Sequence, residues 1–173
     1  MKKTLWITRT AVLIAMLVLL QGVTKAGGQF VTGSCVNAVL AIAVLFSGLW
    51  SGLTVAVISP FLAYFLGIGP QLIPIVPAIV VGNVVYVLIL HLLCSKRELP
   101  IWRKGIGMVG AAVCKFLALY LIVVQLLCRI LTLPEKQVTT FTAMFSWPQL
   151  ITALIGGAVA LTIVPTLHKA FRR

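Results

Sequence analysis

One charged residue interrupts a long apolar stretch of this chain. Lys115 lies in the run Ala111-Ala-Val-Cys-Lys115-Phe-Leu-Ala-Leu-Tyr120, which contains no other charge. A lysine among apolar residues needs oxygen atoms or an anion around its amine. Two interpretations stay open. Backbone carbonyls and waters satisfy the amine at a helix contact, or the amine faces a water-accessible cavity and meets an anionic or carbonyl group of a ligand, which is the interpretation we favour.

Uncharged polar and aromatic side chains also lie within apolar segments. Amides in such surroundings require hydrogen-bond partners, so each of them joins two helices or contacts a ligand. Asn83 and Tyr86 are three residues apart and share a helix face, and Gly82 allows a neighbour to approach the backbone beside Asn83. The residues that we predict to bind a ligand are Asn37, Tyr64, Asn83, Tyr86, Lys115, Trp147 and Gln149.

Catalytic and metal-binding patterns are missing from the sequence. The only acids are Glu98 and Glu135 and the only histidines are His91 and His168, which leaves no carboxylate pair within an apolar segment and no two-histidine metal motif. The four cysteines form no CxxC pair, and no GxxxxGK[ST] phosphate loop is present. We therefore predict no enzyme activity, no metal and no cofactor.

The composition is that of a membrane protein. Of 173 residues, 61% are hydrophobic and 9% are charged, whereas soluble domains contain about 25% charged residues. The formal net charge of +12 would suggest nucleic acid in a soluble protein. Here the cations form short clusters between apolar runs, where they report membrane orientation instead, and we expect no nucleic-acid partner.

The apolar runs predict an all-α integral membrane protein with six transmembrane helices in a single domain over residues 1–173. A bilayer admits only helices or closed barrels, and these runs lack the alternation of barrel strands. The first run resembles a signal peptide, but Lys25 fits a cleavage site poorly, so an uncleaved first span is the better interpretation. The predicted helices are 7–23, 37–46, 51–66, 77–94, 105–131 and 148–170, and Thr24–Val36 and Leu133–Ser146 are connections.

The cations predict the orientation. If the helices alternate in direction, one side carries Lys2, Lys3, Arg9, Lys96, Arg97, Arg103, Lys104, Lys169, Arg172 and Arg173, and the other carries Lys25, Arg129 and Lys136. The positive-inside rule then places both termini in the cytoplasm. Lys115 lies about nine residues into its helix, or ~14 Å, near the centre of a hydrocarbon core about 30 Å thick. The polar set lies in the outer halves of its helices, which favours an outward-facing pocket.

Small residues recur at four-residue spacing, as in closely packed membrane helices. The pairs are Ala11 and Ala15, Gly48 and Gly52, Ala78 and Gly82, Ala153 and Gly157, and Gly156 and Ala160. Ala11 and Ala15 differ from the others because they lie on the first helix, beside the basic end, where a partner protein could dock.

The pattern resembles the S components of energy-coupling factor (ECF) transporters, small six-helix membrane proteins that capture vitamins. The resemblance covers nearly the whole chain. It comprises the Ala11 and Ala15 pair, the Gly-rich segment Lys25–Asn37, the segment Gly48-Leu-Trp-Ser-Gly52 with the helix ending Pro60-Phe61, Gly82-Asn83, Lys115-Phe116, and the run Gln149-Leu-Ile-Thr-Ala-Leu-Ile-Gly156-Gly157.

The resemblance implies a function and partners. Ala11 and Ala15 would dock on a transmembrane coupling subunit that carries two cytoplasmic ATPases, and the outer-half residues, covered by Thr24–Val36, would bind the substrate. The implied location is the bacterial cell membrane. Nickel and cobalt members of the family begin Met-His, whereas this chain begins Met1-Lys2, which argues against a metal substrate. Riboflavin, pantothenate, cobalamin and a queuosine-type base stay open, with Lys115 favouring a carboxylate or phosphate.

Two other functions compete with this one. An MreD-like structural protein of cell-wall synthesis would need no polar outer cavity. A small permease acting alone would need a polar path through both leaflets, which the inner halves of the predicted helices lack apart from Lys115.

Overall fold

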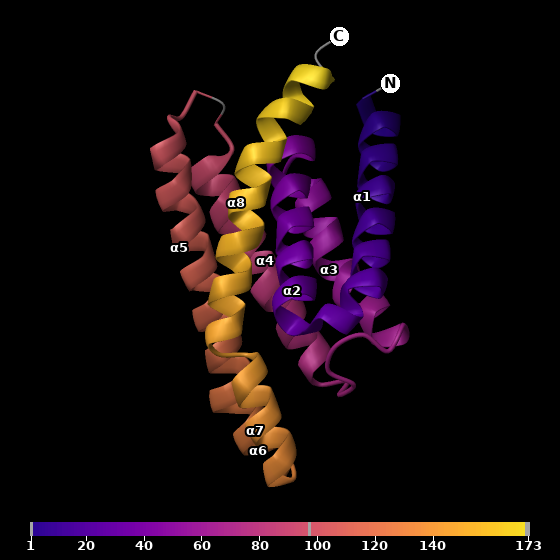
Figure 1. The fold of residues 1–173 in the computed structure, drawn as a ribbon, viewed down its shortest axis with the longest axis vertical. Helices are drawn as coiled ribbons and strands as arrows, with labels where there is room; N and C mark the ends of the chain where they lie inside the picture. The colour runs from indigo at the N-terminus through magenta and orange to yellow at the C-terminus, as the bar shows by residue number, and fades with distance from the viewer. Residues whose placement is uncertain (1, 97, 172–173) are drawn as a thin grey trace.

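The computed structural model describes residues 2–96 and 98–171, which are largely helical and contain no strand in this part of the chain. The helices run mainly along one axis (Figure 1). They are α1 (Lys2–Thr24), α2 (Gly28–Ile42), α3 (Leu49–Phe65), α4 (Ile75–Cys94), α5 (Ile101–Leu119), α6 (Cys128–Ile130), α7 (Glu135–Met144) and α8 (Trp147–Ala170), joined by the short helices η1 (Lys25–Gly27), η2 (Ala43–Ser47) and η3 (Tyr120–Leu127).

The sequence predicted a connection over Thr24–Val36, but the structure shows that this segment is mostly helical. The chain reverses at Gly28, where φ is +73°, and α2 then begins nine residues before the predicted start at Asn37. Thr32 donates to the carbonyl of Thr24 across this reversal. A glycine-rich sequence forms helix here because Gly33 lets α2 approach α8, where an added Cβ would lie 3.0 Å from the Thr152 methyl.

The C-terminal end of α2 continues as the π-helical turn η2 to Ser47, and the chain enters α3 at Gly48, where φ is +98°. An L-residue with a side chain rarely adopts this conformation, so a glycine suits the turn. The other helices differ from expectation by smaller shifts at their ends. The helix predicted at 105–131 comprises α5, η3 and α6, with a π-helical segment from Tyr120 to Leu127.

A second helix lies within the expected connection Leu133–Ser146. Helix α7 carries Phe141, and Phe145 follows its last residue; both are buried in a cluster with Ile75 and Leu119. The three threonines of this segment suggest a polar loop, yet two aromatic side chains four residues apart give the helix an apolar face to bury.

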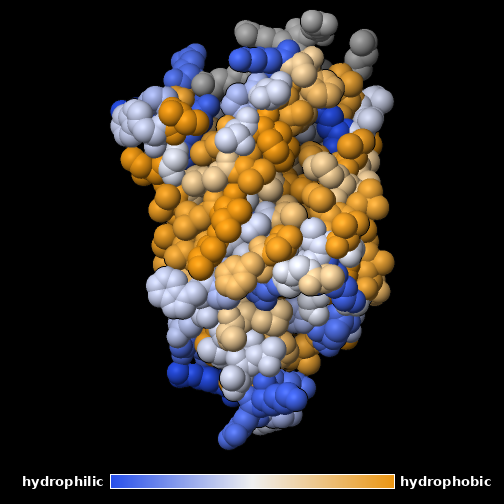
Figure 2. All heavy atoms as spheres, in the orientation of Figure 1, coloured by the Kyte–Doolittle hydropathy of each residue, from blue (hydrophilic) through white to orange (hydrophobic). Residues whose placement is uncertain are grey.

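Within the described residues, four helical stretches are long and apolar enough to cross a membrane: Thr4–Ser47, Ile75–Cys94, Ile101–Ile130 and Glu135–Ala170. Helix α3 is a shorter apolar helix. The first of these folds back on itself, since α2 packs against α1 after the reversal at Gly28. Figure 2 shows an apolar band across the middle of the visible face, with hydrophilic residues toward both ends. This is the surface of a membrane-embedded protein.

The two termini lie at the same end of the bundle, together with the connection between α4 and α5 (Figure 1). We call this the terminal end. The reversal at Lys25–Gly28, the connection between α3 and α4, and α7 lie at the other end, which we call the cavity end.

Glycines set the closest helix contacts in the core. A Cβ added to Gly156 of α8 would lie 2.5 Å from the backbone nitrogen of Ala38 and 2.6 Å from Cβ of Asn37. A Cβ on Gly82 of α4 would lie 2.6 Å from Leu119. Helices α2 and α8 therefore meet backbone to backbone beside Asn37, and this contact fixes the position of that side chain.

We expect Gly156→Ala to lower the free energy of unfolding by about 1–3 kcal/mol, because the added methyl group overpacks the contact between α2 and α8. The matched control is Gly105→Ala in α5, where an added Cβ meets no atom within 4 Å, and where alanine should stabilise the helix by up to about 1 kcal/mol. Thermal unfolding in detergent measures both. Equal stability of the two variants would contradict the close contact.

Candidate functional site

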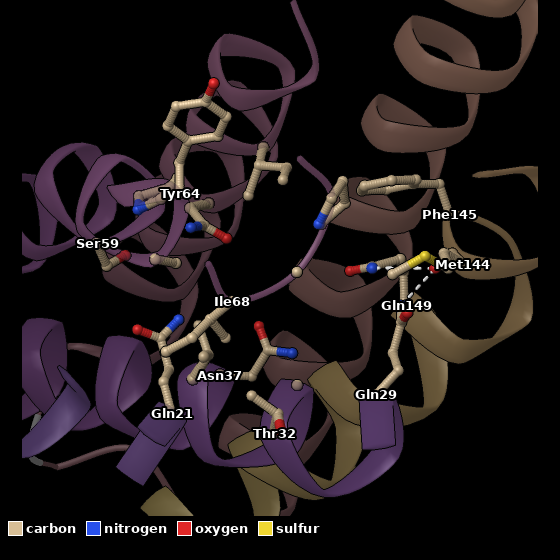
Figure 3. A pocket seen from close by; sticks show the side chains of 18 of the residues that line it. Gln21, Gln29, Thr32, Asn37, Ser59, Tyr64, Ile68, Met144, Phe145 and Gln149 are labelled. Carbon is tan, nitrogen blue, oxygen red and sulfur yellow. Dashed lines mark hydrogen bonds between the residues drawn. The ribbon is translucent and has the colours of Figure 1, made fainter. Parts of the chain in front are cut away.

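A cavity of about 230 Å³ opens among the helices at the cavity end, near the lower limit of small-molecule sites. Its walls come from α1, α2, α3, α4 and α5, from the connection after α3, and from the chain around Met144 and Gln149. Figure 3 shows Gln21, Asn37, Ser59 and Gln149 around one open space. Polar side chains from separate helices thus share a single cavity.

The deepest polar group is a cluster of three side chains, which we call the Lys115 cluster. The Lys115 amine donates to Oδ1 of Asn37 over 2.6 Å and to Oδ1 of Asn83 over 2.7 Å. The three side chains are only 3%, 1% and 1% exposed, respectively. Side-chain amide oxygens from α2 and α4 therefore accept hydrogen bonds from the Lys115 amine. Backbone carbonyls, which were one of the two interpretations of the sequence, do not take this role among the described residues.

A second layer of contacts orients the cluster. Nδ2 of Asn37 donates to the Thr152 hydroxyl over 3.2 Å, which directs its oxygen to the lysine. The amine lies 5.4 Å from the centre of the Tyr86 ring, a favourable distance for a cation and an aromatic face. The Tyr86 hydroxyl in turn donates to the carbonyl of Ala153 over 2.9 Å. Helix α8 thereby holds residues on both α2 and α4.

Another polar group gathers at the carbonyl of Met144, between α7 and α8. Nε2 of Gln29 donates to this oxygen over 2.6 Å, and Nε2 of Gln149 donates to it over 3.1 Å. Both glutamines line the cavity. Gln29 was not among the predicted site residues, since its segment was expected to be a loop.

Three cavity-lining oxygens are buried without a hydrogen-bond partner in the described structure: Oε1 of Gln21, Oε1 of Gln29 and Oγ of Ser59. The Ser59 side chain is 1% exposed. Other hydroxyls in these helices donate to the carbonyl four residues earlier, as Thr54 does to Trp50, but Ser59 does not. Buried polar atoms are nearly always paired, so these oxygens are suited to a ligand.

The structure brings most of the predicted site residues together. Asn37, Asn83, Lys115, Tyr64 and Gln149 line the cavity, and Tyr86 lies beneath it against Lys115. Ser59 and Gln29 were missed; a serine next to Pro60 in an apolar helix is the only signal that the sequence offered for the former.

Trp147 lies outside the cavity. Its side chain is 69% exposed, and its ring stacks on Phe116 with the centroids 6.3 Å apart. As the first residue of α8, it points away from the bundle, where an aromatic side chain suits the membrane interface.

The charged side chains that line the cavity are Lys115 and Lys25, and no described lining residue is acidic. Among residues 2–96 and 98–171, no three His, Cys, Asp or Glu side chains come together as ligands for a metal ion. The donor set is therefore one of amides, hydroxyls and amines, which suits hydrogen bonding to an organic molecule.

Comparison with known protein families gives a match over nearly the whole chain. A family model described as the substrate-specific component of ECF transporters matches residues 6–168. No curated protein and no solved structure matches the chain.

The Lys115 cluster should respond to substitution as a unit. We expect Asn83→Leu or Lys115→Met alone to lower the free energy of unfolding by about 1.5–3 kcal/mol, because each leaves a buried polar group without its partner. The double variant should lose clearly less than the sum. Denaturation of the four proteins in detergent completes the cycle.

The control pair for this cycle is Lys115→Met with Gln125→Leu. The side chain of Gln125 hydrogen-bonds to Tyr120 and Arg129, which lie outside the cluster. These two effects should add within about 0.5 kcal/mol. If the effects of Asn83→Leu and Lys115→Met on the free energy of unfolding also add, the two side chains do not interact as the cluster requires.

Proposed function

Because the chain belongs to the family of substrate-specific components of ECF transporters, we propose that it captures a vitamin or related micronutrient for uptake. Its location in this proposal is the bacterial cell membrane. The substrate enters the cavity from outside the cell and is handed over with a transmembrane coupling subunit and two cytoplasmic ATPases.

The observation that carries the proposal is that the cavity containing the Lys115 cluster lies at the cavity end, separate from a second pocket of about 240 Å³ that is lined by Cys94, Lys104 and His168 toward the terminal end. The cavity is lined by the exposed residues Lys25 and Gly69 at the cavity end and reaches the buried Lys115 cluster inside. Toward the terminal end, the side chains of Tyr86 and Leu90 are buried in the main apolar core. A cavity that is open at one end and closed at the other suits a receptor that holds its cargo until a partner acts.

The same asymmetry weakens the competing functions. A structural scaffold gains nothing from buried, unpaired oxygens in a cavity, since each lowers stability. A permease acting alone needs a continuous polar path, whereas Val87, Leu90 and Ala112 fill the core beyond the cluster.

The proposed orientation places both termini in the cytoplasm, with six spans formed by α1, α2, α3, α4, the continuous stretch from α5 to α6, and α8. Of the ten cations that the sequence assigns to one side, seven belong to described segments toward the terminal end, and Arg97, Arg172 and Arg173 lie outside the described residues. The positive-inside rule supports this end as cytoplasmic and the cavity end as external.

The proposed docking surface for the coupling subunit is the outer face of α1. Ala11 and Ala15 are both exposed there, one turn apart, beside the exposed side chain of Val12. Small side chains let a partner helix approach closely within a membrane. The sequence has no phosphate-binding loop of its own, so a partner must supply the energy for transport.

The orientation can be tested with reporter fusions to the C-terminus. A green fluorescent protein fused there should fluoresce, since it folds in the cytoplasm, and alkaline phosphatase should be inactive, since it requires export. A fusion truncated after Gly69, at the cavity end, should give the opposite pattern. An active phosphatase at the C-terminus would reverse the orientation.

The docking surface can be tested by Ala11→Trp combined with Ala15→Trp. We expect this variant to lose at least about tenfold of its co-purification with the coupling subunit, because two indole rings displace the partner helix by more than a packed interface tolerates. The variant should still retain the small molecule that mass spectrometry finds with the wild-type chain.

The control for the docking test is Leu117→Trp. Leu117 is exposed on α5, which lies on the opposite side of the bundle from α1 (Figure 1), so both readouts should match the wild type. Retained assembly with loss of the small molecule in the Ala11 and Ala15 variant would contradict the proposed division of roles.

A further inference from the structure

The charged side chains that line the cavity are both cations. Lys115 lies at its inner end and Lys25 belongs to η1 at the cavity end, and no described lining residue offsets either charge. Glu135 begins α7 and is exposed, and it makes no salt bridge to a cavity lysine in the structure. A cationic ligand would meet only like charge here, so the site selects against one.

The Lys115 amine hydrogen-bonds to uncharged groups and has no described anionic side chain beside it. An ammonium group has three N–H donors, and the two amide oxygens of Asn37 and Asn83 account for two of them. Amide oxygens carry only partial charge, and a buried cation without an anion is costly in a membrane. The remaining donor and the unbalanced charge both suit an anionic group that enters the cavity.

The number of buried cations limits the charge of that group. Lys115 is the one cation buried in the cavity wall among the described residues, whereas Lys25 is exposed and screened by solvent. A phosphate monoester, with nearly two negative charges at neutral pH, would leave charge unpaired. A single carboxylate matches a single lysine.

The unpartnered oxygens describe the rest of the ligand. Oε1 of Gln21 and Oε1 of Gln29 are acceptors only, and Oγ of Ser59 can accept as well. They require N–H or O–H donors on the bound molecule. Between these polar groups, Ile68, Val76 and Ile79 line the cavity, which favours an apolar body.

We propose that the substrate is a small organic monocarboxylate, an inference that rests on the proposed function. Its carboxylate binds Lys115. Its apolar body carries N–H or O–H groups that donate to Gln21, Gln29 or Ser59. The cavity volume of about 230 Å³ excludes large cofactors from full enclosure. The ligand class follows from the charge balance and from the three open acceptors.

The decisive experiment compares acids with their primary amides on the wild-type chain in detergent. The probes are nicotinate and nicotinamide, biotin and biotinamide, and pantothenate and its primary amide. Thermal shift and equilibrium dialysis measure the binding of each probe. In parallel, small molecules released from the freshly purified protein are identified by mass spectrometry. We expect the acid of one pair to bind about tenfold or more tightly than its amide, or the released compound to be a monocarboxylate.

Variants then place the carboxylate. Lys115→Met should weaken binding of the acid about tenfold or more and bring it close to the affinity of the amide. The control Lys136→Gln removes an exposed lysine at the same end that does not line the cavity, and it should leave both affinities unchanged. The comparison on the wild type stands even if Lys115→Met fails to fold.

The outcomes separate this inference from the proposed function. The monocarboxylate inference fails if an amide binds as tightly as its acid, or if the released compound is neutral or cationic. In either case a small molecule still binds, so the proposed function as a substrate-binding subunit stands. If no probe binds and no compound is released, both the inference and the proposed function fail.

Discussion

A lysine amine in the middle of an apolar helix bundle must be surrounded by oxygen atoms, and this requirement organises the interior of the molecule. Asn37 and Asn83 supply those oxygens from two different helices, so α2, α4 and α5 are joined at one point. The amide nitrogen of Asn37 needs a partner of its own and finds Thr152 on α8. Because each polar atom in the chain of contacts requires the next one, four helices are fixed relative to one another.

Close packing makes these hydrogen bonds possible. Gly156 brings α8 against the backbone of α2 beside Asn37, and Gly82 brings α4 against Leu119 on α5. A larger residue at either position would separate helices whose polar side chains meet over less than 3 Å in the Lys115 cluster. The small residues therefore have two consequences: they increase van der Waals contact within the membrane, and they set the distances of the buried polar contacts.

The two ends of the bundle differ in physical character, and the proposed function rests on this difference. At the cavity end, glutamines converge on one carbonyl and three oxygens lack partners. Toward the terminal end, apolar residues fill the core and α1 presents exposed alanines. Unpaired polar atoms reduce stability, so three that line one cavity are understandable where a bound molecule satisfies them. Two others, Oγ of Ser47 and Nδ1 of His91, lie toward the terminal end and outside that cavity. An outer surface of small apolar residues instead suits contact with another membrane helix.

The sequence by itself determined the membrane class, the approximate places of the long helices and the importance of Lys115, because hydropathy and an isolated charge are local properties. It also pointed to Asn37 and Asn83, since amides in apolar segments need partners. It did not predict that Thr24–Val36 and Leu133–Ser146 are largely helical, because Gly33 acts through a contact with α8, and Phe141 and Phe145 act through contacts with Ile75. These partners lie far away in the chain. Only the tertiary structure decided which polar atoms pair, which stay open, and that Trp147 faces outward, since hydrogen-bond partners and side-chain direction depend on how neighbouring helices are packed.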